Sequence, residues 1–77
     1  MHFTRITINP EIMHGKPCFR GMRVPVHVVL DLLAAGETPM NILTHYPYLE
    51  PDDITEAIRY AAWVTREDTV PLPPIAA

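Results

Sequence analysis

Residues 38–66 read TPMNILTHYPYLEPDDITEAIRYAAWVTR, and this stretch decides the fold. Thr38 is a favoured helix N-cap residue and Pro39 is a favoured first helical residue. A helix is therefore expected to begin here and to end before Pro47, because a residue that precedes proline disfavours the helical conformation.

The second helix of this stretch is expected to open at Pro51 and to end near residues 64–66. Asp52 and Asp53 lie in its first turn, where carboxylates complement the helix dipole. About four residues, 47–50, join the two helices, a length that suits a helix-turn-helix but also other small helical bundles. The apolar faces of the two helices are expected to be Ile42, Leu43 and Tyr46, and then Ile54, Ala57, Ile58, Ala61 and Ala62.

A further helix is expected upstream, from about Val26 or His27 to Ala35, with Gly36 as its stop. Its apolar residues recur at the spacing of one helix face: Val26, Val29, Leu30 and Leu33.

Two short strands are expected before the helices. Residues 6–8 alternate apolar and polar side chains and then meet a turn. Residues 19–26 read FRGMRVPV, with Met22, Val24 and Val26 on one face, Gly21 as the site of a bulge and Pro25 at the end or edge. The fold class predicted from the residues is mainly α, three helices preceded by a short two-stranded β arm. One domain is expected over residues 1–66, followed by a proline-rich extended tail over residues 67–77.

Composition favours a small regulatory or binding protein. The chain has 77 residues, enough for one domain, and a core of this size leaves a thin stability margin, so a homodimer or a partner is expected. Cys18 is the single cysteine, which suits a reducing compartment. Residues 24–30 form the longest strongly apolar run and are too few to span a bilayer, so a cytoplasmic protein without membrane association is expected.

Charge is divided unevenly along the chain. Residues 1–30 hold four of the six basic residues against Glu11 alone, whereas residues 31–77 hold eight of the nine acidic ones. Lys16, Arg20 and Arg23 could contact phosphates, since nearby glycines let a backbone approach an anion. A solvated surface, or an arginine paired with a carboxylate of the acidic part, is an equally good interpretation.

The last helix is not expected to dock into DNA as a simple recognition helix. Recognition helices present their N-terminal residues to base edges. Those residues here include Asp52, Asp53 and Glu56, which would repel a polyanion. If DNA is bound, most of the contacts are expected to come from the basic arm, which is the part of residues 1–30 that carries Lys16, Arg20 and Arg23.

Neither an enzyme nor a metal centre is predicted, and no cofactor is expected. The four histidines do not pair at helical spacing, and Cys18 with His14 forms a poor nucleophile without an orienting group. A pocket that brought His14 and Cys18 together with a carboxylate would reopen the enzyme hypothesis. Tyr60 and Trp63 are candidates for contact with a partner.

The run from Gly15 to Val26, GKPCFRGMRVPV, resembles the signature of bacterial domain-of-unknown-function family 433. Further similarity follows in residues 32–39, at Ile42-Leu43 and Tyr46-Pro47, and between Leu49 and Ala62, so the resemblance covers roughly residues 5–65. The family commonly has threonine at Met22 and an aliphatic residue at Phe19. The signature positions matched are Gly15, Lys16, Pro17, Arg20, Gly21, Arg23 and Pro25.

This resemblance implies a homeodomain-like, helix-turn-helix type of fold. It also implies the antitoxin half of a toxin–antitoxin pair. Such an antitoxin is expected to neutralise a PIN-like ribonuclease and to bind its own promoter DNA. The basic arm suits DNA, and the acidic part and the tail residues Leu72 and Ile75 suit a ribonuclease. The alternatives are a protein-interaction module without a nucleic-acid role and a stand-alone DNA-binding regulator.

Overall fold

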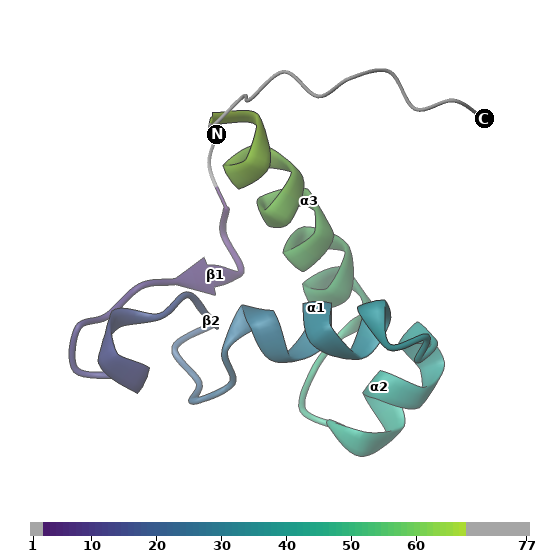
Figure 1. Cartoon of the computed structure of the whole chain (residues 1–77). Helices are drawn as coiled ribbons and strands as arrows, with labels where there is room; N and C mark the ends of the chain where they lie inside the picture. Colours follow the sequence, from purple (N-terminus) through teal and green to yellow (C-terminus); the bar gives the residue numbers. More distant parts are fainter. Residues whose placement is uncertain (1–2, 68–77) are drawn as a thin grey trace.

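The computed structural model describes residues 3–67. Within them, three α-helices follow a two-stranded antiparallel sheet, so the predicted fold class is confirmed (Figure 1). In chain order the elements are β1 (Ile6–Thr7), the 3-10 turn η1 (Met13–Gly15), β2 (Cys18–Phe19), α1 (Val26–Ala34), α2 (Pro39–His45) and α3 (Pro51–Glu67). The tail residues Leu72 and Ile75 lie outside the described part.

The turn between α1 and α2 has the residues that its backbone requires. Gly36 has a φ of +94°, and its backbone N–H donates to the carbonyl of Leu33, while the N–H of Glu37 donates to Leu32. This is the Schellman pattern that ends a helix. Two residues later the hydroxyl of Thr38 accepts the N–H of Asn41 at 3.2 Å, which caps α2 as predicted.

The second strand differs from the prediction. The strand β2 covers only Cys18 and Phe19, where Phe19 pairs with Ile6 and Cys18 with Thr7. The expected continuation of this strand beyond Phe19 is wrong, because Arg20 and Gly21 have φ of +44° and +74° and turn the chain back. Pro25 then returns beside Cys18 as an isolated bridge. The alternation of apolar residues here reflects a tight loop rather than a longer strand.

The core lies where the three helices meet β2. Phe19 is completely buried beside residues of every helix, and Leu49 seals the connection between α2 and α3. The core residues are Phe19, Val24, Val26, Val29, Ile42, Leu49, Ile54 and Ala57. Figure 1 shows that the N-terminal end of α3 joins this core while the rest of the helix extends beyond α1. No helix within residues 3–67 has both the length and the apolarity needed to cross a membrane.

Candidate functional site

The centre of the candidate site is Asp53, a carboxylate with no exposed surface at the start of α3. It accepts hydrogen bonds from Arg20 Nε at 3.1 Å and Arg20 Nη2 at 2.9 Å. Arg5 Nη1 donates at 3.2 Å, and the backbone N–H of Glu50 donates at 2.8 Å. We call Asp53, Arg5, Arg20 and Glu50 the Asp53 cluster. Every lone-pair direction of the buried carboxylate is thereby used, which is what burial of a charge requires.

The helix start itself places Asp53. As the third residue of α3, Asp53 can reach back to the N–H of Glu50, the arrangement of a capping-box carboxylate. The predicted position of Asp53 in the first turn of this helix is confirmed. The two arginine contacts add an ion pair to that cap.

The loop after β2 places Arg20. Its positive φ is unusual for a residue with a side chain, and such strain persists only where the surroundings fix it. The N–H of Met22 donates to Phe19 at 2.7 Å, and the N–H of Gly21 donates to Thr7 Oγ1 at 2.9 Å. The guanidinium also donates to the carbonyl of Tyr48 at 2.8 Å. Arg20 thus joins the loop after β2 to the connection between α2 and α3.

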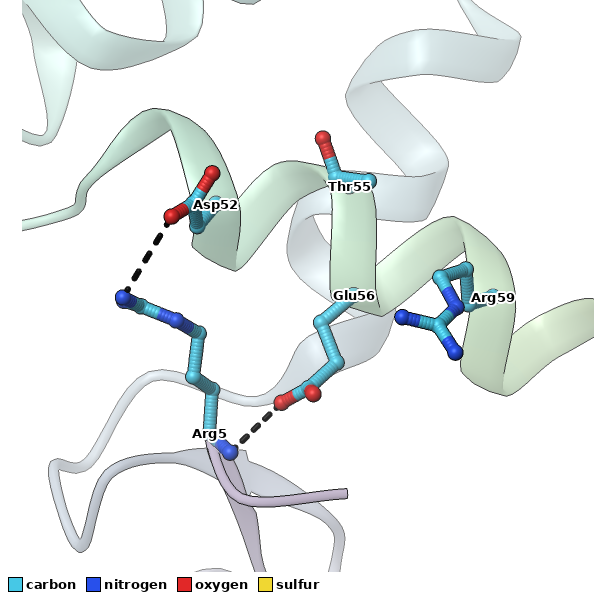
Figure 2. Close-up of a pocket in the computed structure, with 5 residues that line it drawn as sticks. All are labelled: Arg5, Asp52, Thr55, Glu56 and Arg59. Carbon is cyan, nitrogen blue, oxygen red and sulfur yellow. Dashed lines mark hydrogen bonds and ion pairs between the residues drawn. The ribbon is translucent and has the colours of Figure 1, made fainter. Parts of the chain in front are cut away.

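The second arginine, Arg5, comes from the residue just before β1. Its Nη1 lies 2.6 Å from Glu50 Oε1, and its Nη2 lies 3.6 Å from Asp52 Oδ2. Its backbone N–H donates to Glu56 Oε2 at 2.5 Å (Figure 2). One residue therefore ties the N-terminal segment to three carboxylates of α3 and to Glu50. Sequence reasoning did not single out Arg5, and its placement beside the first strand gave no local signal of this role.

Opposing effects act on the pKa of Asp53. Burial would raise it, but the hydrogen bonds from Arg20, the Glu50 amide and Arg5 outweigh burial and hold the pKa below its ordinary value. The same contacts raise the pKa of Arg5, chiefly through Glu50, and of Arg20, chiefly through Asp53. All three groups are charged at neutral pH.

Acid is expected to destabilise the fold through Asp53. An unfolded aspartate titrates near pH 3.9, and the folded group titrates lower. A carboxylate with a depressed folded pKa stabilises the fold above its unfolded pKa, and this contribution is lost as the pH falls through the folded pKa. The free energy of unfolding from urea titrations should therefore fall from about pH 4 downward. The variant Asp53→Asn cannot titrate and should lose this part of the acid dependence; an unchanged acid limb would contradict the assignment.

The other predicted contact residues lie outside the Asp53 cluster. Lys16 and Arg23 are exposed, and among residues 3–67 neither takes part in an ion pair. Gly15 has a φ of +80°, which agrees with its expected role in a turn. Pro17 accepts the N–H of Val26 at 2.8 Å through its carbonyl.

Aromatic residues of α3 hold the N-terminal segment along the helix. The ring of Phe3 meets Tyr60 at 5.3 Å and Trp63 at 5.6 Å between centroids, both edge to face. Tyr60 and Trp63 are only half-buried, so each keeps an accessible edge. Their predicted contact with a partner stays a prediction.

A shallow hollow of about 210 Å³ lies on the outward side of α3 next to the Asp53 cluster. Its lining consists of Arg5, Asp52, Thr55, Glu56 and Arg59 (Figure 2). Two guanidinium groups and two carboxylates line it, and Arg5 contacts both of these carboxylates. It includes neither His14 nor Cys18, whose buried thiol donates to the carbonyl of Lys16 at 3.3 Å.

Comparison with known proteins places these features in a family. A family model described as "Protein of unknown function (DUF433)" matches residues 6–61. "Uncharacterized protein y4eO" of Sinorhizobium fredii (strain NBRC 101917 / NGR234) is 39% identical over 56 residues; the match covers 73% of this chain but 25% of that protein. The crystal structure of a DUF433 member protein from Anabaena variabilis ATCC 29413 matches with a TM-score of 0.75 and 25% identity, covering 82% of this chain and 62% of that one.

Proposed function

The chain belongs to the DUF433 family of proteins of unknown function, and from that premise we propose that it is a non-catalytic, protein-binding regulator of the antitoxin type. Its partner would be a PIN-like ribonuclease, and it would act in the cytoplasm, where Cys18 stays reduced. The surface that we assign to the partner is the acidic start of α3.

One observation carries this proposal: two of the three arginines in residues 1–30, Arg5 and Arg20, are used inside the fold. Arg5 and Arg20 both bond to Asp53, which leaves α3 with an acidic surface at its start. Glu50 and Asp52 keep 55% and 78% of their side-chain surface exposed. The four carboxylates here, Glu50, Asp52, Asp53 and Glu56, outnumber the three guanidiniums of Arg5, Arg20 and Arg59.

An acidic surface selects a cationic partner. Complementary charge accelerates association and excludes partners of like charge. A ribonuclease holds an anionic substrate and therefore presents basic residues around its active site. Binding of the acidic α3 start over such residues would also exclude RNA, which is the action expected of an antitoxin.

We expect a carboxylate pair at this surface to control association with the partner. The tagged full-length chain would be used to isolate its partner from host cells at moderate salt, with and without nuclease treatment. In the double variant Glu50→Gln/Asp52→Asn, association with the purified partner should slow roughly fivefold at low salt, and the difference should shrink as salt rises.

The matched control is Glu11→Gln/Asp31→Asn, which removes the same charge from two exposed acids elsewhere. The proposal fails if both double variants slow association equally, since only net charge would then matter. Recovery of no nuclease-like protein from either sample would remove the antitoxin assignment itself.

A second candidate function is DNA-binding regulation, and an exposed face of α3 beside its acidic start favours it. Thr55, Arg59 and Arg66 recur at helical spacing along one exposed face, whereas sequence reasoning considered only the first turn. Arg5 partly neutralises Asp52 and Glu56 beside that face. Arg20 could contact a phosphate only by leaving Asp53.

The double variants Arg59→Ala/Arg66→Ala and Lys16→Ala/Arg23→Ala separate the two possible DNA surfaces. Each lost phosphate contact should reduce the slope of log affinity against log salt by about 1. A flat titration of the unmodified chain against its promoter at low salt would eliminate this candidate.

A further inference from the structure

One side of α3 carries acidic side chains near its start and aromatic side chains further along. Asp53, Glu56, Tyr60 and Trp63 follow one another at intervals of three, four and three residues, so they lie along one face of the helix. Asp53 is buried and the other three side chains are half-buried. We call these four residues the α3 row.

Residues 3–5 lie against the α3 row, and we call them the strap; Figure 1 shows the chain before β1 running alongside α3. The ring of Phe3 packs edge to face on both aromatic rings of the row. Arg5 donates from its guanidinium to Asp53 and from its backbone N–H to Glu56. The strap therefore shows which chemistry fits the row: an aromatic side chain and, two residues later, an arginine.

The contacts of the strap allow it to leave the row without breaking the fold. Without the Arg5 side chain, Asp53 still accepts two hydrogen bonds from Arg20 and one from a backbone N–H. Release therefore leaves no buried charge unpaired, which is the event that would make it costly. The carbonyl of Arg5 accepts the N–H of Arg20 at 3.0 Å, and β1 begins at the next residue. The strap can thus turn away at Arg5 while the sheet stays intact.

We propose that the α3 row is a binding site for a protein segment in which an aromatic residue precedes an arginine by two positions, and that the strap covers this site until such a segment displaces it. The hollow beside Arg5 extends the site to Thr55 and Arg59, so a segment longer than the strap gains additional contacts there (Figure 2). That the segment belongs to a ribonuclease rests on the proposed function, whereas the site itself does not.

The test uses the full-length chain and a peptide with the sequence of its own residues 3–7, FTRIT, with blocked ends. Binding would be followed through the indole N–H signal of Trp63 in nuclear magnetic resonance spectra. The variant Phe3→Ala/Arg5→Ala should bind the peptide about tenfold more tightly than the unmodified chain, because a site that its own strap covers is available for only a fraction of the time.

Two further variants and a second peptide make this test specific. Phe3→Ala alone keeps every Arg5 contact that holds the fold and should gain about threefold in affinity. Thr4→Ala, at the exposed middle residue of the strap, is the matched control and should gain nothing. The peptide RFTIT has the same composition but places the aromatic residue beside the arginine, so it should bind more weakly than FTRIT. The proposal is overturned if neither Phe3 variant gains affinity, or if the two peptides bind equally.

A purified ribonuclease partner separates this inference from the proposed function. Phe3→Ala should strengthen its binding, the opposite of the effect expected for the carboxylate variant Glu50→Gln/Asp52→Asn. Peptide binding as expected, but with no ribonuclease partner recovered, would support the site and remove only the proposed function. A ribonuclease that binds the unmodified chain and Phe3→Ala equally, together with no peptide binding, would remove only this inference.

Discussion

Replacing Asp53 with alanine is expected to lower the free energy of unfolding by about 3 kcal/mol. Removal of one partner of a buried ion pair usually costs 3–5 kcal/mol. We expect the lower end of that range because the Arg5 and Arg20 side chains are 29% and 34% exposed and can regain water. The Glu50 N–H also loses its acceptor at the start of α3.

Urea titration followed by circular dichroism measures this effect, and a melting scan should show a loss of about 15 °C. The control is Asp52→Ala, whose side chain is 78% exposed and should change stability by less than about 0.5 kcal/mol. Equal effects of the two substitutions would show that the helix dipole, and not the buried ion pair, explains the acidic start of α3.

Replacing Phe19 with alanine is expected to cost about 4 kcal/mol, the middle of the range for a fully buried phenylalanine. The ring fills the space between β2 and the helices, so its loss leaves a cavity that short, interlocked elements cannot close. Because a domain of this size has only about 4–12 kcal/mol of stability, much of the variant should be unfolded on warming.

The matched substitution is Phe19→Leu, which retains most of the apolar volume and should cost only about 1 kcal/mol. An aliphatic residue is also what the resemblance implies at this position. Near-equal losses for leucine and alanine would mean that the aromatic shape itself, and not filled volume, holds β2 against the helices.

The helices were predictable because their signals are local. Thr38 and Pro39 start α2, and Gly36 ends α1, through contacts with residues only a few positions away. The start of α3 at Pro51 follows in the same way, and its end at Glu67 lies within a few residues of the expected position.

The long second strand could not be distinguished from a loop by the sequence pattern. Val24 and Val26 are buried, as the alternation predicts, but the positive φ of Arg20 places a turn inside the run. Glycine at position 21 was interpreted as a bulge, and a bulge and a turn have the same residue preference.

The Asp53 cluster could be foreseen only in part. The pairing of an arginine with a carboxylate of the acidic part was one of two open alternatives, and the structure places Arg20 in that pairing. The identity of the carboxylate and the contribution of Arg5 depend on contacts across 33 and 48 residues of chain. Such contacts leave no periodic pattern in one sequence.

The Asp53 cluster also determines which charged groups the surface offers to a partner. Because Arg20 bonds to Asp53 and to the Tyr48 carbonyl, its charge serves the packing of α3 and is withheld from an outside anion. The start of α3 therefore presents exposed carboxylates, which suit contact with a basic partner protein.

A double-mutant cycle on Arg20 and Asp53 tests this account most directly. The free energies of unfolding of Arg20→Ala, Asp53→Ala and the double variant would be measured by urea titration at low temperature. The account predicts strong non-additivity, with the double variant close in stability to Asp53→Ala alone, because both substitutions remove one interaction. Losses that simply add would show that the two side chains act independently, and Arg20 would then be available for an outside anion.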